Sequence, residues 1–238
     1  CYLNSSWYNP ADGDAREFVI KTVYSGSDGG IYMSTDNGDN WKDLSAGLGI
    51  RQFYRIANSK TNQQLFTGGA QDNGSSVFNN NTWSDWLGAD GMDGLISPEN
   101  ENLMWGTSQF GSLYRSTNYG LSYTTLNRPA AGEWVTPLYY EETERAIYGG
   151  WTGIFKSLDS GATWINVSGS AINTTLTAMT VAPSNRMFIY ASKGSTFFYS
   201  SNGGSSWKTT TIPSDVNAIA VSPTDPSKVW VVCNSFFN

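Results

Sequence analysis

Short runs in which apolar and polar residues alternate recur along this chain of 238 residues, and they predict β-strands rather than helices. Four of these runs end on a serine, at residues 30–34, 111–116, 153–157 and 196–200. They are rich in aromatic and β-branched residues, which suit a pleated, half-buried surface. Each run is followed by a polar, glycine-containing segment, so each is expected to be one strand of a hairpin.

The polar segments share the pattern Ser-x-Asp-x-Gly-x-x-Trp, here called the box. Full boxes occupy residues 34–41 and 157–164, and degenerate boxes occupy 116–123 and 200–207. Ser, Asp and Asn side chains bond to nearby backbone amides, and glycine adopts a positive φ without a steric penalty. The ring that ends each box is expected to be buried beside the turn. The residues expected to shape the four turns are Ser34, Asp36, Gly38, Trp41, Ser116, Asn118, Gly120, Tyr123, Ser157, Asp159, Gly161, Trp164, Ser200, Asn202, Gly204 and Trp207.

The boxes recur at a fixed period, because their serines are 82, 41 and 43 residues apart and 82 is two periods. An apolar strand, a turn and a second apolar strand also recur, over residues 94–106, 179–190 and 218–232. One repeat therefore holds about four short strands in roughly 40–45 residues, which is typical of a β-propeller blade. The expected fold class is all-β, with four-stranded antiparallel blades.

We expect blades to begin near residues 17, 52, 93, 135, 176 and 216, with the last one incomplete. The box missing from the series belongs near residues 72–83, where the outer turn looks rebuilt. An open propeller leaves unpaired strand edges. Either residues 1–16 supply closing strands, or the chain is a piece of a longer one, and the second interpretation is favoured.

Composition narrows the functional classes. The net charge is −6 and no basic patch is present, so nucleic acid is not an expected partner. The sequence contains no run of 18 apolar residues, so no membrane-spanning helix is expected. The composition is typical of a secreted protein, so an extracellular or cell-surface location is expected.

Histidine is absent, which excludes histidine-based nucleophile activation and argues against zinc. No metal or other cofactor is expected. The two cysteines, Cys1 and Cys233, lie near opposite ends of the chain. They are compatible with a disulfide, with a lipidated Cys1, or with an arbitrary start at residue 1.

The box resembles the Asp-box, or bacterial neuraminidase repeat, of sialidases, xyloglucan-active endoglucanases and sortilin-type receptor domains. Further segments resemble sortilin-like repeat propellers secreted by Bacteroidota, namely residues 23–32, 52–57, 68–74, 88–94 and 105–111. The resemblance implies a propeller in which the boxes are structural features of outer hairpins.

A binding function is the favoured interpretation. The turn six or seven residues before each box serine falls in register from repeat to repeat, so its residues are expected to ring one face. These candidate binding residues are Asp28, Gln71, Asp72, Gln109, Phe110, Trp151 and Lys193. The rings of Phe110 and Trp151 are suited to stacking on sugars or peptides. The chain is therefore expected to bind a protein or glycan, as a recognition or assembly module of a larger secreted protein.

The alternative is a glycoside hydrolase of the sialidase-like or endoglucanase-like kind, which needs two carboxylates across the scissile bond. Asp72, Asp90 and Asp93 are the candidates, because they lie beside glycine-rich turns next to predicted strands. Residues 54–57, Tyr-Arg-Ile-Ala, also resemble the sialidase Tyr/Phe-Arg-Ile-Pro motif, with alanine in place of proline. An ordinary turn role for the aspartates and an inner-strand role for Arg55 are favoured over catalysis.

Overall fold

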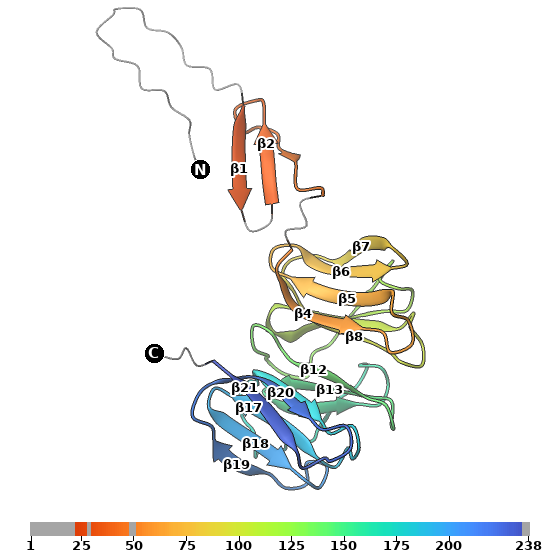
Figure 1. Cartoon of the computed structure of the whole chain (residues 1–238), viewed down its shortest axis with the longest axis vertical. Helices are drawn as coiled ribbons and strands as arrows, with labels where there is room; N and C mark the ends of the chain where they lie inside the picture. The colour runs from red at the N-terminus through yellow and green to blue at the C-terminus, as the bar shows by residue number, and fades with distance from the viewer. Residues whose placement is uncertain (1–21, 28–29, 48–50, 235–238) are drawn as a thin grey trace, which may run out of the picture. The chain divides into compact units, whose positions relative to one another are not determined.

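The computed structural model describes residues 22–27, 30–47 and 51–234, which form an all-β protein (Figure 1). The chain divides into two compact units, Cys1–Gln52 and Phe53–Asn238. Among the described residues the only helical segment is the single 3₁₀ turn η1 (Gln109–Gly111), and no helix there has the length and hydropathy to cross a membrane.

The described part of the first unit is a three-stranded antiparallel sheet of β1 (Val23–Ser27), β2 (Gly30–Ser34) and β3 (Lys42–Asp43). The first box joins β2 to β3. The candidate binding residue Asp28, Cys1 and the expected closing segment 1–16 lie outside the described residues.

The second unit contains four four-stranded antiparallel sheets and one two-stranded sheet, which confirms the predicted blade architecture. The first sheet comprises β4 (Phe53–Asn58), β5 (Leu65–Ala70), β6 (Gly74–Asn79) and β7 (Thr82–Leu87). The second comprises β8 (Gly91–Ile96), β9 (Met104–Ser108), β10 (Ser112–Ser116) and β11 (Thr124–Leu126). The third comprises β12 (Leu138–Glu141), β13 (Ala146–Trp151), β14 (Gly153–Ser157) and β15 (Ile165–Asn166). The fourth comprises β16 (Ala178–Val181), β17 (Ile189–Lys193), β18 (Thr196–Ser200) and β19 (Lys208–Thr211), and the last pairs β20 (Val216–Val221) with β21 (Val229–Cys233).

The sheets of this unit follow one another in chain order, and the first strand of each, β4, β8, β12, β16 and β20, lies beside the first strand of the next (Figure 1). Because neighbouring strands are antiparallel, the connections gather at two ends. The box end carries the boxes of the second, third and fourth sheets. The loop end carries the turns between second and third strands, at 71–73, 109–111, 152 and 194–195, and the segments 88–90, 127–137, 167–177 and 212–215 that lead into the next sheet.

Apolar side chains fill the space between consecutive sheets. Leu65, Val77 and Trp86 of the first sheet form one buried cluster with Ile96 and Met104 of the second. Each such side chain contributes about 1.5–3 kcal/mol when it is fully buried. This packing between blades, rather than within one sheet, is the core of the unit.

One glycine shows how closely these sheets approach. A Cβ atom added to Gly106 of β9 would lie 2.7 Å from Cζ2 of Trp86. The indole of Trp86 therefore occupies the space that any other residue at 106 would fill.

The four boxes share one hydrogen-bond pattern. The serine Oγ accepts the amide of the box glycine at 2.8–2.9 Å, and it donates to Oδ1 of the Asp or Asn at 2.8–3.0 Å. That Oδ1 also accepts the amide four residues further on, at 2.8–2.9 Å. In the sheet without a box, β6 and β7 are joined by Asn80 and Asn81, both with positive φ, which is typical of a tight hairpin turn.

The rings that end the boxes are less uniform than expected. Trp164 and Trp207 are partly buried, and Trp164 packs edge-to-face on Trp151 with ring centroids 4.8 Å apart. The expectation of a buried ring is wrong for Trp41 and Tyr123, which are about half exposed. The local turn places each ring beside its box, but burial also requires a neighbouring surface to cover it.

Candidate functional site

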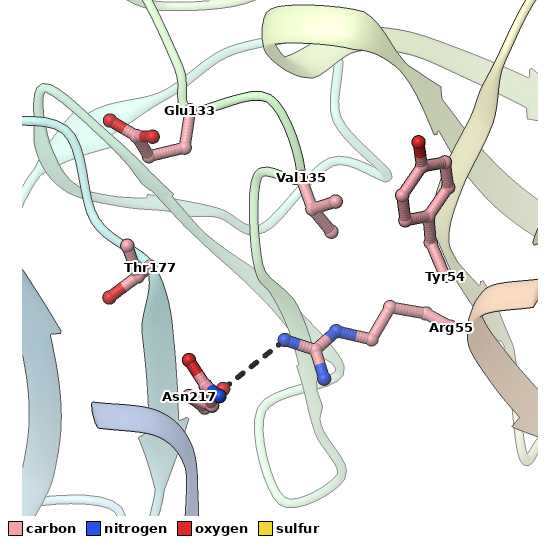
Figure 2. Close-up of a pocket in the computed structure, with 6 residues that line it drawn as sticks. All are labelled: Tyr54, Arg55, Glu133, Val135, Thr177 and Asn217. Carbon is pink, nitrogen blue, oxygen red and sulfur yellow. Dashed lines mark hydrogen bonds between the residues drawn. The ribbon is translucent and has the colours of Figure 1, made fainter. Parts of the chain in front are cut away.

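A pocket of about 410 Å³ opens at the loop end of the second unit, where the first strands of the sheets meet (Figure 2). Its lining residues are Tyr54, Arg55, Glu133, Val135, Thr177 and Asn217. They come from β4, from β20, and from the segments that lead into β12 and β16. The pocket is therefore assembled from four different sheets.

Arg55 is the cationic side chain among these lining residues. It extends from β4 across the pocket, and its Nη2 donates to the main-chain oxygen of Asn217 on β20 at 3.4 Å (Figure 2). This bond is long for an N–H···O contact. A guanidinium carries five donors, so most of its hydrogen-bonding capacity remains available to a ligand.

Asp93, one of the three candidate catalytic residues, lies on β8 and is not among the residues that line the pocket. Its Oδ2 accepts the amide of Leu138 at 3.0 Å, and its Oδ1 accepts the amide of Gly94 at 2.8 Å. Burial raises the pKa of the Asp93 carboxyl, while the two amide bonds and the charge of Arg55 oppose that rise. Oδ2 therefore ties the start of β12 to β8, and Oδ1 is bonded within β8 itself.

Glu133 connects the segment 127–137 to the neighbouring sheet. Its Oε1 accepts hydrogen bonds from Lys193 at the end of β17 and from Thr175 before β16. Partial burial alone raises the pKa of Glu133, but these two bonds and the charge of Lys193 outweigh it and leave the pKa below its usual value. Lys193, a candidate binding residue, is thus engaged in an ion pair at the pocket edge.

Two exposed rings stand beside the pocket. Phe110 and Trp134 pack edge-to-face with centroids 5.3 Å apart, and their side chains are 51% and 41% exposed. Trp134 Nε1 donates to the Tyr54 hydroxyl at 3.2 Å, and Arg128 Nη1 donates to the main-chain oxygen of Phe110 at 2.6 Å. Phe110 also has a φ of 58°, an uncommon conformation for an aromatic residue.

The remaining aspartate candidates form a separate group at the loop end. Asp90 Oδ1 accepts the amide of Asp72 at 2.6 Å, and Asp90 Oδ2 accepts Nε2 of Gln109 at 2.6 Å. Asp90 thereby ties the turn of the first sheet, which contains Gln71, to η1 of the second. The structure brings Asp72, Asp90 and Gln109 together, and it engages both oxygens of Asp90 in holding the two turns.

Trp151 is a correction to the candidate binding residues. It is 0% exposed, its Nε1 donates to the main-chain oxygen of Gly111 at 3.0 Å, and its ring packs against Phe155 and Trp164. At the end of β13 the side chain points between two sheets rather than toward solvent, so it cannot stack on a ligand.

The sequence analysis missed five residues of this site, namely Glu133, Trp134, Val135, Thr177 and Asn217. Segment length is a signal that points to four of them. Glu133, Trp134 and Val135 lie in 127–137 and Thr177 lies in 167–177, and these two equally long segments are the longest of the described segments that join one sheet of this unit to the next. Within the described residues, no cluster of three or more His, Cys, Asp or Glu side chains is placed to hold a metal ion. Cys233 lies on β21, and the three interpretations of the cysteines stay open because Cys1 is outside the described residues.

Comparison with known proteins supports the fold. No family model and no curated protein matches the chain. Among solved structures, it is similar to an ancestral GH74 enzyme, with a TM-score of 0.60 and 18% identity over 85% of this chain and 32% of that one. It is also similar to the GH74 enzyme of Niastella koreensis, with a TM-score of 0.62 and 17% identity over 90% and 42% of the two chains. YCF48 from Cyanidioschyzon merolae gives a TM-score of 0.53 and 12% identity over 77% and 64%.

The chain thus spans less than half the length of either GH74 enzyme. At these identities the likeness establishes a shared β-propeller fold. Ligands and activities are a separate question.

Proposed function

We propose that the chain is an Asp-box propeller of the sortilin-like type, which works outside the cell as a recognition module of a larger secreted protein. Its ligand, a glycan or a protein, occupies the pocket at the loop end. The observation that carries this proposal is the placement of two exposed rings, Phe110 and Trp134, beside a pocket that contains Arg55.

The pocket is held in shape before any ligand arrives. Trp134 is bonded to Tyr54, Glu133 is bonded to Lys193 and Thr175, and the main chain of Phe110 is bonded to Arg128. Side chains that are already ordered lose less conformational entropy on binding, so a rigid site of this kind favours recognition. Aromatic walls with a few converging polar groups are also the usual composition of ligand pockets.

Glycoside hydrolysis is the second candidate. It is favoured by the opposite pKa shifts of Asp93 and Glu133, because acid and base pairs in enzymes have pKa values that differ in this way. Two features favour binding instead. Both oxygens of Asp93 accept main-chain amides, and Asp93 does not line the pocket.

Calorimetric titration with panels of oligosaccharides and peptides tests the proposal. A ligand that occupies the pocket and contacts the Trp134 ring should lose at least about tenfold in affinity with Trp134→Ala, since truncating an aromatic anchor of a binding site costs about 2 kcal/mol or more. Trp230→Ala is the matched control, because Trp230 is 52% exposed and lies near the start of β21, at the box end rather than the loop end.

Turnover assays on the same oligosaccharides separate the two candidate functions. The binding module should release no product. Hydrolysis that is abolished by Asp93→Asn, or by Asp72→Asn or Asp90→Asn, would establish the enzyme and end the recognition-only proposal.

A further inference from the structure

We infer that the partner is a protein, which docks on the loop end through an apolar side chain accompanied by an acidic and a basic one. The docking surface, here called the rim, consists of the rings of Phe110 and Trp134 and the exposed charges of Arg128 and Asp72. This inference rests on the proposed function, because it names the partner of the same recognition site.

The backbone holds the Phe110 ring in a fixed position on the rim. The Phe110 amide donates to the main-chain oxygen of Trp134 at 3.3 Å, and its own main-chain oxygen accepts Nη1 of Arg128 at 2.6 Å. The φ of 58° is strained, and such strain persists only where the surrounding bonds over-determine it. Because the ring is half exposed, its burial does not account for this strain, whereas presentation to a partner does.

The two rings form a corner rather than a flat platform. Their planes are inclined at 83° to each other. A flat sugar ring stacks on a single aromatic face, whereas two perpendicular rings enclose a compact apolar side chain from two directions. Tryptophan and arginine are also the residues most enriched at the energetic centres of protein–protein interfaces. The rim therefore fits a protein surface better than a glycan.

Arg128 gives the rim an available cation. It is exposed, its Nη1 bonds to the Phe110 oxygen, and within the described residues it makes no ion pair. The remaining donors of its guanidinium suit a carboxylate. Arg55 does not serve this purpose, because its charge already acts on the buried carboxyl of Asp93. An acidic side chain of the partner is therefore expected opposite Arg128.

Asp72 gives the rim the opposite charge. Asp90 accepts the amide of Asp72 and the side chain of Gln109, so the turn of the first sheet is tied to η1. The Asp72 carboxylate itself is exposed and, in the described part of the chain, accepts no hydrogen bond. A basic side chain of the partner complements it. Charge patterns of this kind fix orientation and speed association more than they raise affinity.

The experiment is selection of a random-peptide library, displayed on phage, against the immobilised full chain, with counter-selection on Trp134→Ala. The recovered peptides should carry an apolar residue close to an acidic one. Their affinity should fall at least about tenfold with Phe110→Ala, because a few aromatic anchors supply most of the binding energy. Recovery of no peptide that depends on Phe110 would overturn the inference.

Charge reversal tests the orientation of the partner. Arg128→Glu should slow association of the selected peptides about tenfold or more at low ionic strength, and a repeated selection on it should favour basic residues over acidic ones. Asp72→Lys should remove any preference for basic residues. Lys208→Glu is the matched control, because it changes the net charge equally at the exposed box-end start of β19.

Circular dichroism checks the fold of each variant. If Arg128→Glu does not fold, Arg128→Gln removes the charge while it keeps a donor for the Phe110 oxygen, and it should also abolish the acidic preference. An unchanged acidic preference in a folded Arg128 variant would overturn the inference.

The remaining outcomes separate this inference from the proposed function. Oligosaccharide binding that is lost with Trp134→Ala and unchanged by Arg128→Glu, without any Phe110-dependent peptide, would overturn the protein partner and keep the recognition pocket. Failure of both oligosaccharides and peptides to respond to Trp134→Ala would overturn the proposed function itself.

Discussion

Trp134 donates a hydrogen bond from its indole nitrogen to the hydroxyl of Tyr54, at 3.2 Å and across 80 positions of sequence. This bond fastens the segment 127–137, which carries Glu133 and Val135, to the first strand of the second unit. The pocket wall therefore depends on a contact between two sheets that are not consecutive in the chain.

Tyr54→Phe should loosen the Trp134 indole without unfolding the protein. Because Trp134 is 41% exposed, water can replace the lost acceptor, and the stability cost should stay below about 1.5 kcal/mol. The measurement is exchange of the indole N–H by NMR, with the resonance assigned from Trp134→Phe. An unchanged exchange rate would show that the Tyr54 bond does not hold the ring.

The ion pair of Glu133 and Lys193 should contribute little to the free energy of unfolding, and this contribution should depend on pH. Both side chains are about one-third exposed, so a double-mutant cycle with Glu133→Gln and Lys193→Met should give no more than about 1 kcal/mol. The pKa of Glu133 is lowered in the folded state, so its contribution is fully present above the usual value of 4.5 and is lost as pH falls through the lowered value. Urea unfolding of the four proteins of the cycle across this pH range measures the coupling energy. A coupling energy that persists in strong acid would contradict the prediction.

Exchanging Asp and Asn at equivalent positions of two boxes should change the stability of the protein in acid in opposite directions. Hydrogen bonds from Thr163 and Ser157 lower the pKa of Asp159 to about 2. Asn202 occupies the equivalent position and does not titrate: its Oδ1 accepts from Ser200 and from the Ser206 amide, and its Nδ2 donates to the Ser206 hydroxyl. Asp159 therefore stabilises the fold above its usual pKa of 3.8, and this stabilisation disappears as pH falls toward about 2. Asp159→Asn should make acid unfolding less steep in that window, and Asn202→Asp should make it steeper. Acid titration by circular dichroism checks both, and parallel behaviour of the two variants would contradict the assignment.

Two tryptophans in contact should respond oppositely to replacement by phenylalanine. Trp151 is fully buried and bonded to the main-chain oxygen of Gly111, so Trp151→Phe leaves that oxygen unpaired and should cost about 1–3 kcal/mol. In the described part of the chain, Nε1 of Trp164 is buried without a partner. Trp164→Phe removes that unpaired donor and should be neutral or stabilising. Chemical denaturation gives the free energy of unfolding of both variants. Equal losses of stability in the two variants would contradict the prediction.

Replacing Phe110 by asparagine should affect stability and ligand binding differently. Its left-handed backbone costs about 1–2 kcal/mol for a residue with a Cβ, and asparagine tolerates this conformation better. Phe110→Asn should therefore leave thermal stability unchanged or raised while it weakens ligand binding. A variant that loses stability would indicate that the exposed ring supports the fold.

The sequence by itself determined the local architecture. The hydrogen bonds within a box link residues two to four positions apart, so Ser34, Asp36 and Gly38 specify their turn without help from the rest of the fold. Alternating strands beside these turns then indicate four-stranded sheets, and their repetition indicates a propeller. These features are legible because the interactions that produce them lie within a few residues of each other.

Only the tertiary structure decided which side chains share a pocket. Arg55 meets Asn217 across 162 positions, and Glu133 meets Lys193 across 60, because the packing of successive sheets brings their first strands around one centre. The same packing buried Trp151 and left Phe110 exposed, although both occupy equivalent turns in the repeat. A local pattern determines where a side chain starts along its strand, whereas its burial depends on the neighbouring sheet that covers it.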